Sequence, residues 1–342
     1  MEIKIKVPKG FELEKAVCNH GFFMMAPNRW MPSTKTLVRP LRLRDQLSVT
    51  VSISQISPTS LLITIPDDNP ISFSHCPYIT DQVTRMLRLS PTEEARVKEF
   101  HRLHADAAKK GFGRLFRNPS LFEDLIKSLL LCSSSFQKTL EMAEGLCVLQ
   151  KRLDVKEGLV RNAKRGRKKA SDCDEESWGN FPSIEELALL DSKENLLRIN
   201  CKLGYRARWV MLLVENVTKG KICLMDLEKL FDGNQLYPIL RSFNGFGDFA
   251  ASNAFMCMGF YDRVPCDTET IRHFKQVHGR IDCDHKNVWA MANERYDMYA
   301  PFQALAYWLE MVDYYEINLG KLSLLDRCRY KNVAGTSIDR SS

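Results

Sequence analysis

The sequence of 342 residues lacks several features that define whole classes of protein. No two of its cysteines are separated by just two residues, so a zinc ribbon or zinc finger is not expected. It has no apolar run close to the roughly 18 residues that a membrane-spanning helix needs. Its first residues lack the apolar core of a signal peptide. These absences set aside secreted, membrane and collagenous proteins.

The eleven cysteines that are present do not form the pattern of a disulfide framework. Their number is odd, they are scattered, and several lie inside apolar stretches such as 129–132 and 254–258. Cysteines of this kind are typical of buried free thiols in a protein of a reducing compartment.

The composition predicts a globular protein with a substantial core. Hydrophobic residues make up 44% of the chain and aromatic residues 10%, and the length suggests two domains. Lysine and arginine together number 49, against 42 aspartate and glutamate residues, which gives a net charge of +7. This modest excess is compatible with an anionic partner but does not prove one.

The order of secondary structure predicts an α+β fold. The first third contains β-branched or alternating runs with few helical features, and an antiparallel sheet is the economical reading of them. From about residue 79 the apolar residues recur at helical spacing. The expected strands are 3–7, 37–43, 47–54 and 61–66, and the main expected helices are 79–89, 90–107, 120–132, 136–150, 183–190, 205–217 and 301–315.

We therefore expect a sheet domain with helices over residues 1–112 and a helical domain over 113–326. Residues 150–179 are expected to form a charged, disordered insertion, and 327–342 a flexible tail. The insertion contains the basic block KRGRKK (164–169), followed by the acidic run 172–176. The block indicates nuclear import or nucleic-acid contact, or else a solvated loop.

The segment 236–272 carries the pattern with the most chemical content. One helical stretch ends at SFNGFG and a second begins directly after it, so Gly245 and Gly247 predict a tight hairpin between two helices. The amides at the start of the second helix would then be exposed. Such a helix N-terminus can hold a DNA phosphate without recognising sequence.

An aspartate follows this hairpin at a defined distance. Asp267 lies 22 residues after Gly245, just past a Val-Pro pair and before another helical run. As an N-cap, it would face the same groove as the hairpin. Read without its surroundings, it is an ordinary helix cap.

This arrangement resembles the helix-hairpin-helix DNA glycosylases that carry a catalytic aspartate. The resemblance covers most of the chain and is closest to the 8-oxoguanine DNA glycosylase branch. Its further landmarks, in order, are CSSS (132–135), NFPS (180–183), KLGYRARWV (202–210) and YAPFQALAYW (299–308).

The resemblance implies an α+β fold in which an N-terminal antiparallel sheet domain precedes an all-α glycosylase domain. It implies that Asp267 stabilises positive charge on the deoxyribose as the base leaves, and orients or deprotonates water. Phe249 stands where bifunctional members carry a nucleophilic lysine. Since phenylalanine has no amine, the resemblance implies a monofunctional enzyme.

The base pocket implied by the resemblance departs from that of the 8-oxoguanine branch. Asn253 stands at the pocket cysteine, and Tyr307 and Met311 replace the glutamine and phenylalanine that clasp oxidised guanine. The aromatic Phe249 instead resembles the alkylpurine-type members. Tyr307 and Met311 are equally compatible with core packing at i, i+4.

The implied DNA contacts come from three places. Tyr205 and Arg206 match positions that enter the duplex and contact the orphaned base, with Arg208 on phosphates. Candidate plugs of the gap left by the flipped base are Ser135, Phe136 and Gln137. A monovalent cation on the backbone of residues 243–247 is implied, whereas no metal held by side chains, iron–sulfur cluster or other cofactor is expected.

The sequence thus favours a nuclear, monofunctional DNA N-glycosylase that flips a damaged base out of double-stranded DNA and hydrolyses its glycosidic bond. The expected substrates are alkylated purines rather than 8-oxoguanine. One alternative is a non-catalytic DNA-binding protein that keeps this fold. Another is a helical protein–protein interaction module, which would be favoured if the surface around 205–208 and 245–249 were not electropositive.

Overall fold

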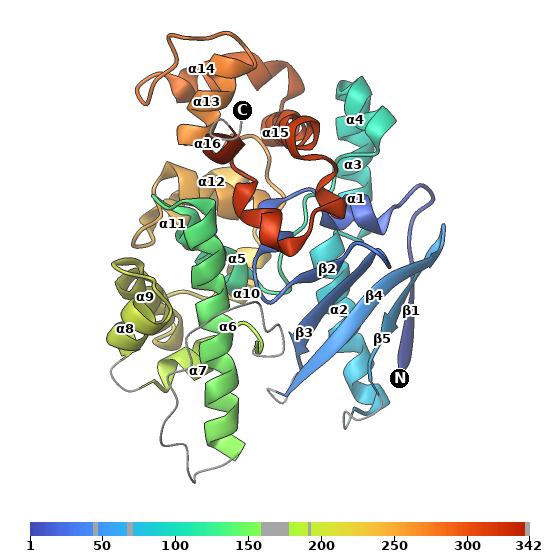
Figure 1. Cartoon of the computed structure of the whole chain (residues 1–342), viewed down its shortest axis with the longest axis vertical. Helices are drawn as coiled ribbons and strands as arrows, with labels where there is room; N and C mark the ends of the chain where they lie inside the picture. Colours follow the sequence, from blue (N-terminus) through green and yellow to red (C-terminus); the bar gives the residue numbers. More distant parts are fainter. Residues whose placement is uncertain (44–46, 67–70, 159–177, 191–192, 339–342) are drawn as a thin grey trace.

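A computed structural model describes residues 1–43, 47–66, 71–158, 178–190 and 193–338. A twisted antiparallel sheet lies on one side of the molecule and a larger helical body on the other (Figure 1). The basic block 164–169 lies outside the described residues. No helix in the described ranges is long and apolar enough to cross a membrane, and the ten cysteines within them are free.

The sheet has five strands in the order β1-β5-β4-β3-β2, and every neighbouring pair is antiparallel. Its alternating sequence buries one face, as in β4, where Val49, Val51 and Ile53 are buried. The four expected strands are confirmed, and a short fifth was not expected. The strands are β1 (Glu2–Lys6), β2 (Arg29–Met31), β3 (Thr36–Arg42), β4 (Ser48–Ser57) and β5 (Ser60–Thr64).

Helices α1 (Leu13–Val17) and α2 (Cys76–Leu87) accompany the sheet, and the remaining helices build the other body. The further helices are α3 (Pro91–Leu103), α4 (Ala105–Lys110), α5 (Leu121–Leu131), α6 (Phe136–Gly158), α7 (Ile184–Ala188), α8 (Lys193–Asn195), α9 (Arg206–Thr218), α10 (Leu224–Glu228), α11 (Gly233–Ser242), α12 (Asp248–Cys257), α13 (Thr268–Gln276), α14 (Val288–Tyr296), α15 (Gln303–Leu319) and α16 (Gly335–Ile338). Every expected helical segment is present, but the expected helix 90–107 is divided at His104 into two helices, α3 and α4, and α6 continues beyond its expected end at residue 150.

Helix α6 corrects the expected start of the charged insertion. The helix continues to Gly158, so residues 150–158 are helical. Residues 159–177 of that insertion lie outside the described residues.

The C-terminal segment 327–338 contradicts the expectation of a flexible tail. It forms the short helix Arg327–Asn332 and then α16, and Tyr330, Val333 and Ile338 are buried. The ring of Tyr330 packs edge-on against Phe23, with centroids 5.6 Å apart. These apolar residues follow no helical or strand period because each reaches the core from a short turn, so the sequence pattern did not reveal them.

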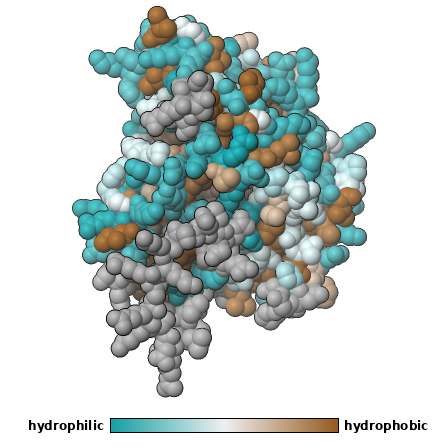
Figure 2. Space-filling view, in the orientation of Figure 1, coloured by the Kyte–Doolittle hydropathy of each residue, from teal (hydrophilic) through white to brown (hydrophobic). Residues whose placement is uncertain are grey.

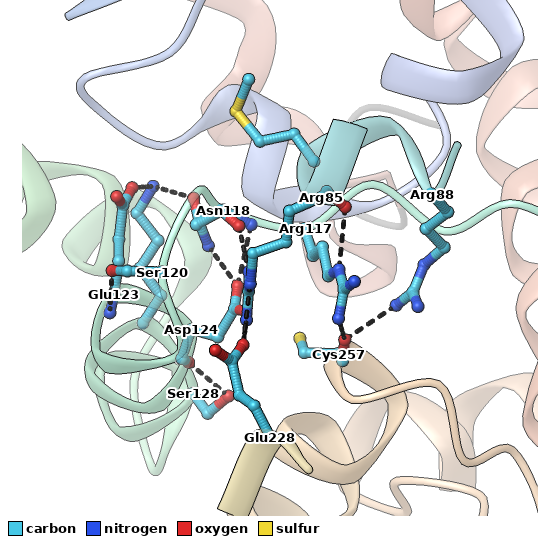
Figure 3. A network of polar contacts seen from close by, with 12 residues as sticks. Arg85, Arg88, Arg117, Asn118, Ser120, Glu123, Asp124, Ser128, Glu228 and Cys257 are labelled. Carbon is cyan, nitrogen blue, oxygen red and sulfur yellow. Dashed lines mark hydrogen bonds and ion pairs between the residues drawn. The ribbon is translucent and has the colours of Figure 1, made fainter. Parts of the chain in front are cut away.

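Helix α12 is held at its C-terminal end by two arginines. The guanidinium of Arg88, just past α2, donates to the carbonyls of Met256 at 2.8 Å and Cys257 at 3.1 Å. Arg117 donates to the Cys257 carbonyl at 2.9 Å (Figure 3). Arg88 is 1% exposed and pairs with Glu93 at 3.0 Å. The last carbonyls of α12, which have no partner within the helix, thus bind positive charge.

Two further arginines connect the sheet side to α5. Arg85 of α2 pairs with Asp124 of α5 at 2.9 Å and with Glu228 of α10 at 2.6 Å (Figure 3). Arg39 of β3 pairs with Glu123 of α5 at 3.0 Å, and both side chains are buried. Since α5 packs against α12, the network fixes the helical body to the sheet.

The face drawn in Figure 2 carries hydrophobic residues scattered among hydrophilic ones, and its described part shows no broad apolar patch. Scattered apolar residues are ordinary for a protein surface. The described part of this face therefore shows no extended apolar surface.

We expect Arg88→Met to lower the free energy of unfolding by about 3–5 kcal/mol, because it leaves Glu93 and the end of α12 without their buried cation. Denaturant titration measures the change as a lower midpoint at unchanged slope. Arg102→Met, at an exposed position of α3, is the matched control and should change stability by less than about 0.5 kcal/mol. Equal losses of stability from the two substitutions would contradict the conclusion that Arg88 holds the C-terminal end of α12.

Candidate active site

The expected hairpin is present between α11 and α12, and it requires a glycine. Gly245 has φ +85°, and a Cβ at this position would run into the indole ring of Trp209 in α9. Positive φ and the close approach both favour glycine. Trp209 thus ties α9 to the hairpin, a contact that the sequence did not reveal.

The start of α12 exposes its first amides but also carries an acidic residue. Gly247 is the exposed N-cap, and Asp248 occupies the first turn. Arg241 pairs with Asp248 at 3.0 Å, and its guanidinium also donates to the Phe246 carbonyl at 2.9 Å. The carboxylate and an incoming phosphate would compete for the same positive end of the helix.

The hairpin backbone does not fit the expected monovalent cation. The carbonyls of Phe243 and Gly245 accept amide hydrogen bonds within the turn, and that of Phe246 accepts from Arg241. The guanidinium of Arg241 on the Phe246 carbonyl places a positive charge beside the expected cation position, and the two charges would repel each other. No step of the function is therefore derived through such an ion.

Asp267 caps α13 with one carboxylate oxygen. Its Oδ1 accepts from the amides of Glu269 at 2.9 Å and Thr270 at 3.1 Å, and the Asp267 amide donates to the Thr270 hydroxyl. The reciprocal bonds form a capping box. The bonds that the carboxylate accepts in this cap all end on Oδ1, which leaves Oδ2 for the cavity that this residue lines.

The environment of Asp267 disfavours its charged form. Burial raises the pKa of this carboxyl from its ordinary 3.8 to about 6, and the negative charge of Glu269 adds to the increase. The hydrogen bonds of the cap oppose these effects only in part. A carboxyl whose pKa is raised in a cavity is a candidate for acid–base or electrostatic catalysis.

A cavity of about 180 Å³ lies next to Asp267. Its walls come from the segment 19–24, the α5–α6 junction, α12, the start of α13, α15 and the C-terminal segment. Aromatic rings supply much of the lining, and no lysine or arginine is among the residues that line it. A flat, largely apolar ring system suits such a space.

All four expected pocket residues line this cavity together with Asp267. Phe249 is half-buried, and Asn253, which is 2% exposed, donates to the Phe249 carbonyl at 3.0 Å. The Tyr307 hydroxyl lies 2.9 Å from that of Thr270, one bond away from the aspartate cap. Met311 is 1% exposed and belongs to the hydrophobic core, so it both lines the cavity and packs in the core.

Two walls of the cavity were not found by sequence reasoning. His20 and Phe22 come from the segment between α1 and β2, and Val333 and Ala334 come from the C-terminal segment. The amide of Gly335 donates to Glu269 in the first turn of α13 at 2.9 Å, which ties the second wall to the site. Neither segment carries a motif, because only tertiary packing brings them here.

The expected plug residues lie at the mouth of the cavity or beside it. Ser135 is exposed and Phe136 is half-buried, and both line the cavity. Gln137 is exposed and does not line it. Tyr205, 52% exposed, stands on the neighbouring helix start with its ring edge-on to Trp209. An exposed tyrosine held against a second ring is suited to enter a duplex.

The structure contradicts the expected role of Arg206. Its side chain is buried, and its guanidinium donates to the carbonyls of Cys132 and Ser133. Ser133 adopts φ +46°, so the loop needs this support. Arg206 is thus a positioning residue for the loop that carries Ser135 and Phe136. Arg208 is exposed, as a phosphate contact requires.

One group in the described residues has the composition of a metal site. The potential ligand atoms of His273, His278 and Glu310 lie within 4.8 Å of one another. Both imidazoles instead contact Glu310, at 3.1 and 2.8 Å, and Tyr296 and Arg295 also bind its carboxylate. In the described residues the buried Nδ1 of His273 has no partner, whereas a metal-bound imidazole almost always donates its other N–H to an acceptor. We regard the group as a link between α13, α14 and α15.

No protein-family model matches the sequence, and no curated protein matches it. Solved structures do match over almost the whole chain, and they are DNA glycosylases. Their sequence identity of 16% shows the fold alone. The chain thus has the fold that the 8-oxoguanine and 3-methyladenine DNA glycosylases share, as its sequence predicts.

One similar structure is the 8-oxoguanine glycosylase/lyase of Clostridium acetobutylicum, with a TM-score of 0.60 over 90% of this chain and 94% of that one. The same protein in complex with double-stranded DNA, which contains cytosine opposite 8-oxoguanine, also has a TM-score of 0.60, over 93% and 98% of the two chains, at 16% identity. The 3-methyladenine DNA glycosylase of Archaeoglobus fulgidus has a TM-score of 0.63 over 92% of this chain and 98% of that one.

We expect Arg206→Ala to act on the loop rather than on an orphaned base. Because the substitution leaves the carbonyls of Cys132 and Ser133 without a cationic donor, the free energy of unfolding should fall by about 1–3 kcal/mol. Thermal and denaturant unfolding measure this loss. Arg208→Ala, on the exposed side of the same helix, is the control that should leave stability unchanged. Unaltered stability of Arg206→Ala would restore the DNA-contact interpretation.

Asp248→Asn should strengthen DNA binding several-fold at low salt. The substitution removes a negative charge from the first turn of α12 and frees Arg241 for a phosphate. Titration of a labelled duplex at two salt concentrations measures the effect, and the difference should shrink as salt rises. Asp226→Asn, exposed in α10, is the charge-matched control. Weaker binding of Asp248→Asn would show that the hairpin does not contact phosphate.

Proposed function

We propose that this protein is a monofunctional DNA N-glycosylase of base excision repair, which removes a damaged base and leaves an abasic site. The observation that carries the proposal is the carboxylate of Asp267, which lines an aromatic cavity beside a helix-hairpin-helix turn. A duplex base cannot reach such a cavity unless it is rotated out of the stack. The exposed Tyr205 and the loop with Ser135 and Phe136 are positioned to fill the gap.

In this proposal Asp267 works through charge. As the glycosidic bond breaks, positive charge develops on the deoxyribose, and the oxygen Oδ2 stabilises it at the cavity wall. The bond electrons leave with the base, and a water molecule, oriented or deprotonated by the carboxylate, adds to the sugar. The bonds to Oδ1 hold the group in place throughout.

The lining of the cavity supports hydrolysis without strand cleavage. A bifunctional glycosylase uses an amine that forms an imine with the sugar. Phe249 occupies the position that follows the hairpin, and none of the residues that line the cavity is a lysine. The lining residues therefore offer no amine for an imine, and water is the nucleophile of the proposed step.

The same lining favours alkylated purines as substrates. Phe249, Tyr307 and Trp308 contribute aromatic rings to the lining, Asp267 and Glu269 contribute carboxyl groups, and no lysine or arginine is among the lining residues. Rings and carboxylates stabilise a flat base that carries positive charge. The partner is double-stranded DNA with such a base, bound through phosphates and therefore weakened by salt.

The raised pKa of Asp267 distinguishes this proposal from a purely DNA-binding protein. A half-buried carboxyl that resists ionisation lowers stability at neutral pH, and a protein that only binds DNA gains nothing from it. Nuclear residence completes the proposal, because the substrate is chromosomal DNA. It is supported by the basic block 164–169 of the sequence.

Asp267→Asn should reduce base release by at least about a hundredfold while DNA binding persists, since asparagine caps a helix equally well but carries no charge. The measurement is excision from oligonucleotides that each carry one lesion.

Alkylated purines should be the substrates, and strong selective excision of 8-oxoguanine would overturn this choice. The wild-type kcat/KM should rise with pH through about 6, where Asp267 ionises. A wild-type rate in Asp267→Asn would refute the mechanism.

The same variant should be more stable than the wild type at pH 7. The pKa of Asp267 is higher in the folded protein than the ordinary 3.8, so the wild type loses stability as pH rises from about 4 to 6. The variant lacks this loss. Its free energy of unfolding should therefore exceed that of the wild type by roughly 1–3 kcal/mol at pH 7, and the two should be equal below pH 4. Denaturant midpoints at both pH values measure it, and an equal gain at both would exclude titration of Asp267 as the cause.

The reaction should stop at the abasic site. Borohydride should trap no covalent protein–DNA adduct, because no lysine lines the cavity to form an imine. Strand breaks should appear only after the reacted DNA is heated with alkali. Efficient trapping would show that another lysine reaches the sugar and that the enzyme is bifunctional.

A further inference from the structure

His20 is a polar residue of the cavity wall that the mechanism above does not use. It lies just before the turn Gly21–Met24, lines the cavity and is 4% exposed. Its Nδ1 is buried and has no hydrogen-bond partner in the described residues. Buried polar atoms in folded proteins are almost always paired, so an enclosed Nδ1 without a partner disfavours the form of the ring that carries its hydrogen there.

The ring of His20 cannot turn away to find a partner. It packs edge-on against Phe22, with centroids 4.5 Å apart, and tilted against Trp308 at 5.0 Å. Trp308 also donates to the carbonyl of Asn19, and Asn28 donates to that of Phe22. The backbone on both sides of the imidazole is therefore fixed, and the ring is held beside the cavity before any ligand arrives.

The imidazole is neutral at physiological pH. Burial lowers the pKa of His20 to about 3, and the positive charges of Arg88 and Lys127 act in the same direction. A neutral ring carries one hydrogen, and the described part of the chain offers no acceptor for it at the enclosed Nδ1. The hydrogen accordingly belongs on Nε2, which makes this nitrogen a donor. A neutral donor also does not repel a positively charged base.

We propose that His20 selects the base in the cavity by donating a hydrogen bond from Nε2 to an acceptor on the edge of the flipped base. The inference rests on the proposed function and deepens it. It assigns as substrates purines that present a ring nitrogen or carbonyl oxygen at this edge. A base without that acceptor leaves the donor unpaired in an apolar cavity, which disfavours its binding.

The first test pairs variants of His20 with substrates that lack single acceptors. Duplexes carry an alkylated purine or its analogues in which N3, N7 or the 6-substituent acceptor is removed. The wild type should lose about tenfold or more in excision rate on one of these analogues. His20→Phe should excise the parent base more slowly than the wild type does, by a similar factor. Its excision rate should not fall further on that analogue. An unchanged profile in His20→Phe, or equal losses on all substrates, overturns the assignment.

Two controls separate selection from folding. His285→Phe, at an exposed position, should behave as the wild type. His20→Gln, which keeps a donor of similar reach, should retain more discrimination than His20→Phe at comparable thermal stability. If selectivity among the substrates falls with the thermal stability of the variants, and does not depend on whether residue 20 carries a donor, His20 is a packing residue and the proposal is overturned.

A second measurement distinguishes this proposal from the proposed function itself. If the wild type releases no base from any lesion, the proposed function fails, and His20 is then followed by nitrogen NMR of labelled imidazoles. Free 3-methyladenine added to the wild type should shift the His20 signals and leave those of His285 unchanged. The signals should also show a neutral ring with hydrogen on Nε2 between pH 8 and 5. Absence of a shift, or a charged ring, overturns the assignment.

Discussion

The fixation of helix α12 at both ends is the constraint on which the rest of the site depends. Arg88 and Arg117 bind the carbonyls at its C-terminal end, and the hairpin closed by Gly245 and Trp209 precedes its first turn. The helix dipole places negative charge at the arginines and positive charge at the hairpin. Phe249 and Asn253 of this helix line the cavity, and in the proposed function the amides of its first turn bind a phosphate.

The helix that follows places a charge beside the cavity in an unfavourable environment. Asp267 is held by the α13 amides on one oxygen, while burial and Glu269 raise its pKa to about 6. The cavity around it is closed by the N-terminal segment with His20 and by the C-terminal segment with Val333. Poor solvation of this carboxylate lowers the stability of the fold. In the proposed reaction, the same poor solvation strengthens its attraction to the positive charge that forms on the sugar.

The features that the sequence predicted correctly are those with a local cause. The hairpin follows from Gly245, the cap of α13 from Asp267, and the strands and helices from their apolar periods. The approach of Phe249, Asn253, Tyr307 and Met311 to one cavity followed from the family resemblance, since their separation in the chain contains no such information.

The features that were wrong or missed depend on tertiary contacts. Arg206 has the sequence context of a DNA contact, but two carbonyls of a distant loop bind its guanidinium. The C-terminal segment is polar on average, yet Tyr330 and Val333 reach the core from short turns. The segment around His20 carries no periodic or motif signal, and only the fold brings it to the cavity.

The central claim, that Asp267 stabilises positive charge on the sugar, is tested most directly with unreactive DNA. One duplex carries a positively charged pyrrolidine in place of the damaged nucleotide, and the other carries the neutral tetrahydrofuran. Because a site complementary to the transition state binds the charged mimic better, the wild type should prefer the pyrrolidine duplex by about a hundredfold or more. Asp267→Asn should bind the two duplexes almost equally. Equal affinity of the wild type for both duplexes would contradict the account.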